Sequence, residues 1–304
     1  MEFFKANTKI RFMSQQKIAA AFSIIIFIGS IAALAMNGLN LGLDFTGGNE
    51  AVVNFTQPAD VSQIRDNLNQ AGFDQATVTP YSPKQIAVKI GLHKSKSQDQ
   101  VKADLLKAMP GGTITSYEFI GPEVGQQLMT NGILAIIVSL IGVMIYIALR
   151  FEMRFAASAA VALIHDPILI FGMFAAFHWE FNMVVLTAVL TVIGYSINDT
   201  VVVYDRVREN FRRIRKKTSR EIMDISINQT LSRTIMTSGV TMLVVIALLI
   251  FGGPTFHGFS LALIIGIVIG TYSSIYVAGS MAVAMGLSPK HLVAVDKKFD
   301  DGMP

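Results

Sequence analysis

Six long apolar runs restrict the fold of this sequence more than any other feature. They span residues 18–36, 131–149, 155–177, 183–204, 235–252 and 258–285. A helix needs about 20 predominantly apolar residues to cross the hydrocarbon core of a bilayer. Only 15% of the residues are charged, whereas about 25% is usual in soluble domains. The sequence therefore predicts an α-helical polytopic membrane protein with six transmembrane helices.

The lysines and arginines indicate how these helices are oriented. Residues 1–17 contain four of them, 150–154 two, 205–234 nine and 286–304 three, whereas the two remaining short loops contain none. Short cytoplasmic loops carry the excess of positive charge in membrane proteins. Both termini are therefore predicted to be cytoplasmic. The long loop 37–130 falls on the outer side, where long domains cross regardless of their charge.

The basic segment 205–234 is interpreted as a cytoplasmic loop that fixes topology and favours anionic lipid headgroups. A docking surface for a cytoplasmic partner is the alternative. Nucleic acid is not expected as a partner, because no basic fold with interleaved aromatic residues accompanies the segment. The chain contains no cysteine, which excludes disulfides and thiolate metal sites. We expect no catalytic residue, no bound metal and no cofactor.

Within the outer loop, residues 49–121 have the pattern of a small α+β domain. Alternating, β-rich segments are separated by two stretches with helical spacing, at 59–72 and 97–112. The predicted order is β-α-β-β-α-β, the ferredoxin-like arrangement. This fold serves many functions and specifies none. The domain is therefore interpreted as a binding or spacer module.

Two carboxylates lie within the predicted spans, where an ionisable residue costs roughly 2.5–3.5 kcal/mol and indicates function. Asp166 lies near the middle of the third span, next to His165, and Asp199 lies in the cytoplasmic half of the fourth. Arg233 begins the fifth span in the same half, so its guanidinium can approach Asp199. Burial favours a neutral carboxylate and a nearby arginine favours a charged one, so helix motion would load or release a proton.

A fixed ion pair that holds the helices together is the alternative for Asp199 and Arg233. For Asp166, the alternative is an internal hydrogen-bonded role. Small residues, including Gly266 and Gly270, recur every four positions in the sixth span. That spacing lets another helix approach closely, so both glycines are predicted to serve helix packing.

Five segments together resemble one known family. They read LDFTGGNE after the first span, HDP in the third, VIGYSINDTVVVYDRVREN in the fourth, QTLSRTIMTSG into the fifth, and FGGPTFHGFSLALIIGIVIGTYSSIY in the last hairpin. On these segments the chain resembles the SecD/SecF family of protein-export membrane proteins, in the resistance-nodulation-division superfamily. The match is with its SecF-type members and covers nearly the whole chain.

The resemblance implies a SecD partner, with which the chain would form a pseudo-symmetric unit of twelve spans. It also implies association with the SecYEG channel and YajC, extending to YidC, and contact with the translocating preprotein. The implied activity is not enzymatic. It is export across the bacterial inner membrane, driven by a proton or sodium gradient after the steps that SecA drives. The outer domain would then be periplasmic.

The resemblance also assigns roles to residues. In the family, the aspartate of the fourth span and the arginine of the fifth belong to the ion path with an aspartate from SecD, and these positions match Asp199 and Arg233. Asp44, Gly47 and Gly48 match the DFTGG motif, for which a structural or coupling role is expected. The third-span motif usually continues with an apolar residue after His-Asp, whereas here proline follows Asp166, so its place in the ion path is the weaker match.

Three other functions stay open on the sequence. A proton-driven lipid or drug exporter of the same superfamily would usually carry twelve spans in one chain. An intramembrane protease would use Asp166 and Asp199 together, but the Gly-x-Gly-Asp context of such enzymes is absent. A passive scaffold between SecD and the channel would tolerate replacement of Asp199 and Arg233. The coupling ion also stays open, because the oxygens of residues 198–200 suit either H⁺ or Na⁺.

Overall fold

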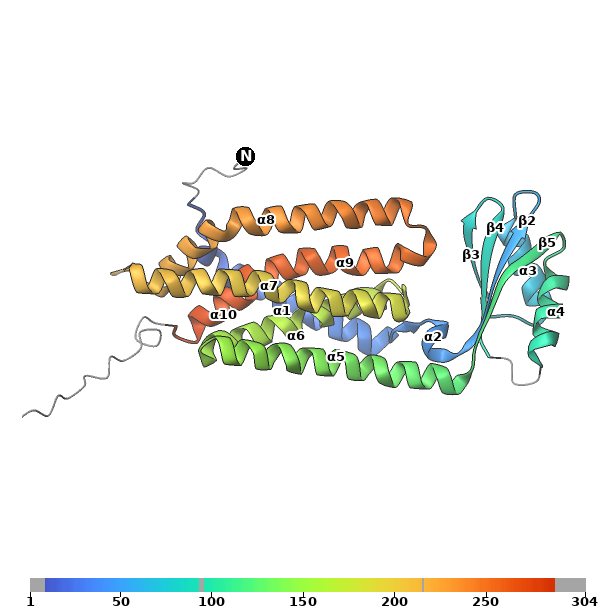
Figure 1. Ribbon diagram of the computed structural model, residues 1–304, viewed down its shortest axis with the longest axis horizontal. Helices are drawn as coiled ribbons and strands as arrows, with labels where there is room; N and C mark the ends of the chain where they lie inside the picture. Colours follow the sequence, from blue (N-terminus) through green and yellow to red (C-terminus); the bar gives the residue numbers. More distant parts are fainter. Residues whose placement is uncertain (1–8, 93–95, 215, 288–304) are drawn as a thin grey trace, which may run out of the picture.

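The computed structural model describes residues 9–92, 96–214 and 216–287, so the predicted terminal segments 1–17 and 286–304 fall partly outside it. It has an elongated helical bundle with a small α/β domain at one end (Figure 1). Within the described residues, six helical segments are long and apolar enough to cross a bilayer. They are α1 (Gln16–Asn37, after a 3₁₀ turn at Phe12–Gln15), α5 (Pro122–Arg150), α6 (Met153–Ala176), α7 (Met183–Arg213), α8 (Ser219–Phe251), and α9 (Pro254–Tyr272) with its continuation.

Local sequence signals account for where several of these helices begin. Proline is the first residue of α5 and of α9, where its missing N–H leaves no helical hydrogen bond unmade. Asn182 caps α7 by accepting a hydrogen bond from the backbone N–H of Val185 at 3.0 Å. α8 begins with a capping box between Thr218 and Glu221. α5 therefore begins in the outer domain, well before the apolar run at 131–149.

The segment 205–234, predicted as the cytoplasmic connection between two spans, is largely helical. α7 continues to Arg213 and α8 begins at Ser219, so only a short linker separates two helices. Ion pairs one turn apart, from Arg206 and Arg213 to Glu209, lie along the polar end of α7. Such pairs stabilise a helix in water. The hydropathy pattern marks where the apolar surface ends, and the helices extend beyond that point.

The sixth predicted span, 258–285, is not one regular helix. α9 is followed by a π-helical turn, η2 (Ser273–Ala278), and then by α10 (Gly279–Ala284). π-helical turns are rare and occur mainly as local bulges, often at functional sites. Proline usually breaks or kinks a helix. In α6, however, Pro167 lies within the helix, which continues to Ala176.

The outer domain follows the predicted order of elements. These are β2 (Gly48–Phe55), α3 (Val61–Gln70), β3 (Thr77–Ser82), β4 (Gln85–Ile90), α4 (Gln98–Ala108) and β5 (Gly112–Ile120). The four strands pair antiparallel in the order β3-β4-β2-β5. Alternate residues of β2, including Ala51 and Val53, are buried in one core with Leu68 of α3 and Leu105 of α4. Both helices therefore cover one face of the sheet, and the other face is turned toward the bundle (Figure 1).

A short junction that the sequence pattern did not predict connects the domain to the bundle. β1 (Asn40–Leu41) pairs in parallel with β6 (Glu180–Phe181), which directly precedes α7. Between β1 and the sheet lies a helical turn, α2 (Leu43–Thr46). It is followed by Gly47, whose φ is +74°, and by Gly48, whose φ is +147°. A Cβ on Gly48 would lie 2.4 Å from the carbonyl oxygen of Ile90, so this turn requires glycine.

Candidate functional site

The two predicted membrane carboxylates are both buried in the bundle. Asp166 on α6 is 1% exposed and Asp199 on α7 is 3% exposed. A buried carboxylate is costly unless it is hydrogen-bonded, paired or neutral. The partners of each group therefore decide what it does.

Asp166 is held by side chains from three parts of the bundle. Its Oδ2 accepts hydrogen bonds from the hydroxyls of Ser196 on α7, at 2.5 Å, and Ser273 in η2, at 2.8 Å. Its Oδ1 lies 3.0 Å from Nδ1 of the adjacent His165. The carboxylate thus joins α6, α7 and the π-helical turn.

Close packing of α7 against α9 brings the hydroxyls of the two serines within hydrogen-bonding distance of Asp166. A Cβ on Gly270 would lie 3.2 Å from the Cβ of Ser196, and a Cβ on Gly266 would lie 2.2 Å from a methyl group of Val192. The absence of side chains at these two glycines lets the helices approach. The first residue of η2, Ser273, comes one turn after Gly270, which brings its hydroxyl to Asp166.

The imidazole of His165 faces a different environment from that of its carboxylate neighbour. Its ring stacks on Phe27 of α1, with centroids 5.9 Å apart and planes inclined by 4°. Its Nε2 is buried and has no hydrogen-bond partner among the described residues. His165 therefore contacts Asp166 through one nitrogen and apolar surroundings through the rest of the ring.

Asp199 differs sharply from Asp166 in its partners. Its Oδ2 accepts no hydrogen bond from the described part of the chain. Arg233 on α8 is near enough to act on it electrostatically. The two do not form an ion pair within 4 Å in the residues that the structure covers, and Arg233 is exposed on the bundle surface. The fixed ion pair that the sequence left open is therefore not formed in this conformation.

One helix connects the surroundings of the two carboxylates. Ser196, which binds Asp166, precedes Asp199 by three residues on α7, a rise of about 4.5 Å along the helix axis. Residues three apart lie on neighbouring parts of one helix face. Thr200, beside Asp199, donates its hydroxyl to the backbone carbonyl of Ser196 at 3.3 Å. α7 therefore carries a strip of polar groups through an otherwise apolar bundle.

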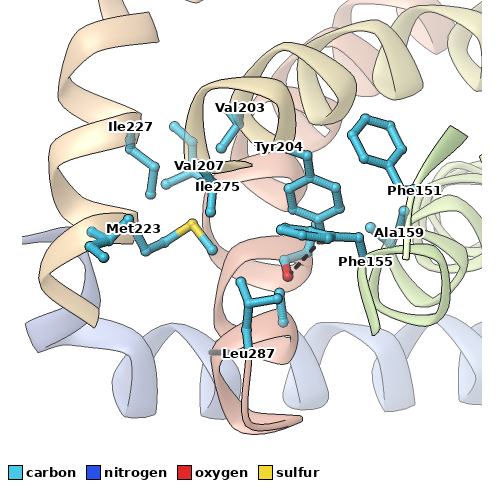
Figure 2. Close-up of a cluster of buried hydrophobic side chains, with 14 of the residues drawn as sticks. Phe151, Phe155, Ala159, Val203, Tyr204, Val207, Met223, Ile227, Ile275 and Leu287 are labelled. Carbon is cyan, nitrogen blue, oxygen red and sulfur yellow. Dashed lines mark hydrogen bonds between the residues drawn. The ribbon is translucent and has the colours of Figure 1, made fainter. Parts of the chain in front are cut away.

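Toward its Arg213 end, α7 enters a dense apolar cluster (Figure 2). Tyr204 is fully buried there, with its ring centroid 4.6 Å from that of Phe155. Its hydroxyl is hydrogen-bonded to Ser158 at 2.7 Å and to the carbonyl of Ala278 at 3.0 Å. The polar strip around Asp199 therefore borders tightly packed apolar side chains on this side.

At the other end of α7, the glycine-containing junction contacts the start of the same helix. Oδ2 of Asp44 accepts a hydrogen bond from the backbone N–H of Met183, the first residue of α7, at 2.9 Å. An acidic group at a helix N-terminus is stabilised by the helix dipole. Gly47 and Gly48 provide the turn that returns the chain to the sheet. The motif thus fixes the outer domain to the helix that carries Asp199.

The predicted site residues fall into three separate groups in the structure. Asp199 and Arg233 lie on neighbouring helices, Asp166 lies in its own hydrogen-bonded cluster, and the Asp44 motif lies at the outer end of α7. Sequence reasoning missed Ser196 and Ser273, because serine is common in membrane helices and carries no distinctive spacing. In the described part of the chain, no three His, Cys, Asp or Glu side chains are grouped so as to hold a metal.

Comparison with known proteins gives matches over almost the whole chain. Residues 32–59 match the family described as SecD/SecF GG Motif, and residues 100–288 match Protein export membrane protein SecD/SecF, C-terminal. The chain is 45% identical to the protein translocase subunit SecF of Vibrio alginolyticus, covering 96% of this chain and 95% of that one. It is 39% identical to the SecF subunit of Escherichia coli O157:H7, covering 93% and 90%.

Two further matches are with longer proteins, of which this chain covers only a part. The protein translocase subunit SecDF of Brucella abortus is 39% identical over 95% of this chain, which spans 39% of that protein. The crystal structure of SecDF, a translocon-associated membrane protein from Thermus thermophilus, superposes with a TM-score of 0.83 at 33% identity. That match covers 93% of this chain and 39% of the longer one.

Proposed function

Because the chain belongs to the SecD/SecF family of protein-export membrane proteins, we propose that it is the SecF-type half of an ion-driven export unit. Its relatives support a role in Sec protein export, and the SecDF relatives support a SecD partner. The finer proposal is that Asp199 and Arg233 couple an ion gradient to late steps of export. In this proposal the chain is a translocation subunit and catalyses no chemical reaction.

One observation carries the proposal, namely the unsatisfied burial of Asp199. The carboxylate is 3% exposed, and its Oδ2 has no hydrogen-bond partner in the described residues. A charged group left in that state is costly. The cost falls if the carboxylate takes up a proton, binds a cation or pairs with Arg233. Each of these events changes the charge between α7 and α8. Asp166 already accepts hydrogen bonds, so the same events would lower its free energy less.

The proposed cycle alternates between these states. When Arg233 approaches, it stabilises the charged carboxylate and the ion leaves. When the arginine withdraws, the carboxylate takes up an ion again. Movement of one charge through the membrane potential supplies about 2.3 kcal/mol per 100 mV, so a few transfers are enough to drive a helix rearrangement.

The outer domain is proposed to be a ferredoxin-like module on the periplasmic side of the bacterial inner membrane. The element order β-α-β-β-α-β and the antiparallel sheet order support the fold assignment. Cytoplasmic termini follow from the distribution of lysine and arginine. SecYEG, YajC and YidC are proposed partners on the strength of the family resemblance alone.

The test is export by vesicles that contain this chain, a SecD subunit and the channel. Preprotein export is followed to completion under an imposed ΔpH and, separately, under a Na⁺ gradient. The variants are Asp199→Asn and, as a matched control, Asp205→Asn. Asp205 lies on the same helix but forms a half-exposed ion pair with Arg150 at 2.5 Å, so it shares the substitution without the buried setting.

We expect gradient-driven export by the wild type and the control, and its loss in Asp199→Asn with assembly intact. Dependence on Na⁺ in place of ΔpH would make Asp199 a sodium site. Normal gradient-driven export by Asp199→Asn would refute the relay and leave the passive scaffold. Transport of a small substrate by this chain alone would favour the exporter, and cleavage of a membrane substrate without a gradient would favour the protease.

A further inference from the structure

The uncovered face of the outer sheet and the outer end of the bundle enclose a cleft of about 520 Å³, here called the outer cleft. This volume lies within the range of about 300–1,000 Å³ that is usual for ligand sites. One wall is formed by β2, β3, β4 and β5, and the other by the junction and the starts of α7 and α9. Its charged and aromatic lining includes Asp44, Glu50, Lys89, Glu118, Trp179 and Glu180.

The outer cleft is acidic. Four carboxylates line it, and the only lysine or arginine among its lining residues is Lys89, so three negative charges stay uncompensated when His257 is neutral. Lys89 is already engaged, because its Nζ lies 2.7 Å from Oε1 of Glu180. This ion pair crosses the cleft from the sheet to the bundle.

The carboxyl group of Glu50 is affected both by burial and by repulsion from the neighbouring carboxylates. Burial raises the pKa of Glu50, Lys89 partly offsets that effect, and Glu180 and Glu118 raise it further, as does Asp44. Tyr81 also faces Glu50, with its hydroxyl 3.5 Å from Oε1. An additional positive charge in the cleft would relieve the repulsion among these carboxylates.

Apolar surface lies beside the charges. Val52, Leu261 and the ring of Trp179 belong to the same lining. Trp179 stacks on Phe177 with ring centroids 4.8 Å apart, which holds the indole in place. Lysine and arginine bury their aliphatic stems against such surface while the charged head reaches a carboxylate. A small inorganic cation would use the charges and leave this surface uncovered.

We propose that the outer cleft binds a positively charged, extended segment of the polypeptide being exported, an inference that rests on the proposed export function. The segment is extended because a cleft of this volume admits a few side chains and no folded domain. A lysine or arginine of that segment competes with Lys89 for Glu180 and pairs with Glu50 and Glu118. The occupant thereby contacts both the sheet and the junction that is fixed to α7.

The chain provides its own reporter for a direct test. Trp179 is its single tryptophan. Because Trp179 lines the outer cleft, the intrinsic tryptophan fluorescence of the chain reports on that cleft. The full chain is placed in nanodiscs of zwitterionic lipid, which avoids binding of basic peptides to anionic headgroups. A tryptophan-free, ten-residue peptide of alternating lysine and serine is titrated in, and a peptide with glutamate in place of lysine is its control.

Two sets of variants separate the site from general charge. Glu50→Gln with Glu118→Gln removes two cleft charges while keeping side-chain size. Asp66→Asn removes one exposed charge from α3, on the covered side of the sheet. We expect saturable binding of the lysine peptide, weakened about tenfold in the double variant, since each partly exposed pair contributes about threefold, and unchanged in Asp66→Asn.

The proposal fails if the lysine peptide gives no saturable signal, if the glutamate peptide binds equally, or if Asp66→Asn weakens binding as much as the double variant. An equal signal from Mg²⁺ alone would replace the peptide site with a simple cation site. In the export assay, normal gradient-driven export by the double variant would also overturn it. If Asp199→Asn exports normally while the peptide still binds the cleft, the failure lies with the proposed relay instead.

Discussion

Asp166→Ala is expected to destabilise the bundle, because the carboxylate of Asp166 bonds two hydroxyl groups from other helical segments. In membrane helices, one such side-chain hydrogen bond is worth about 0.6–1.7 kcal/mol. The substitution breaks the bonds at 2.5 Å and 2.8 Å and leaves Ser196 and Ser273 buried without this acceptor. The summed loss is therefore about 2–3 kcal/mol. Asp166→Asn keeps one acceptor oxygen and should cost about 1 kcal/mol.

The measurement is unfolding of the purified chain by SDS in mixed micelles, followed by circular dichroism. A double-mutant cycle of Asp166→Ala with Ser273→Ala isolates the bond between them, and a coupling energy of about 1 kcal/mol is expected. Ser274→Ala is the matched control. Ser274 is the next residue of η2, and its hydroxyl is bonded to the carbonyl of Thr271.

Export by the Asp166→Asn variant decides between the two roles of the residue. If the carboxylate is a structural connection, the variant keeps gradient-driven export at close to the wild-type rate while Asp199→Asn loses it. Loss of export in Asp166→Asn with unfolding unchanged would show that Asp166 titrates during the cycle. The structural interpretation would also fail if the coupling energy with Ser273→Ala were zero.

Packing, capping and the contact between the domains give three more tests. Gly266→Ala puts a Cβ 2.2 Å from a methyl of Val192 and should destabilise the bundle by about 1–3 kcal/mol; Val192→Ala should recover most of this in SDS unfolding, and no recovery would contradict the packing role. Asp44→Ala removes a cap from α7 and should cost about 1 kcal/mol, more than Asp44→Asn; equal stability to wild type would exclude the cap. Lys89→Glu should loosen the outer domain and speed its proteolysis, and Lys89→Glu with Glu180→Lys should restore protection; failure to restore it would show that the pair does not hold the domain.

The parts of this structure that the sequence predicted are those set by local pattern. Apolar length located six spans, and alternation with helical spacing located four strands and two helices of the outer domain. Asp166 and Asp199 were found because a carboxylate in an apolar run is rare. The helical structure of 205–234 was not predicted, because hydropathy reports contact with lipid, whereas capping and ion pairs extend a helix into water.

The parts that could not be predicted depend on contacts between distant residues. Asp44 caps a helix 139 positions later in the chain, and Ser273 reaches an aspartate 107 positions earlier. Neither contact leaves a mark in the neighbouring sequence. The π-helical turn is likewise invisible to hydropathy, because η2 contains the same small and apolar residues as α9 before it. The contact of Ser273, together with that of Ser196, is what satisfies Asp166 and not Asp199.

α7 connects the three groups of site residues, because Asp44 contacts its first residue, Asp199 lies on it, and its Ser196 binds Asp166. From Met183, which Asp44 caps, to Asp199 is a rise of about 24 Å along a continuous helix. In the proposed cycle, a change of charge at Asp199 that shifts α7 would also act on Asp44 and on Glu180, which line the outer cleft. Arg233 requires a further contact in a membrane, because an arginine exposed on the surface of the bundle is costly against lipid. A second membrane subunit that covers that face of α8 would provide an interaction partner for Arg233. Ion binding and the orientation of the outer domain would then depend on the same interface.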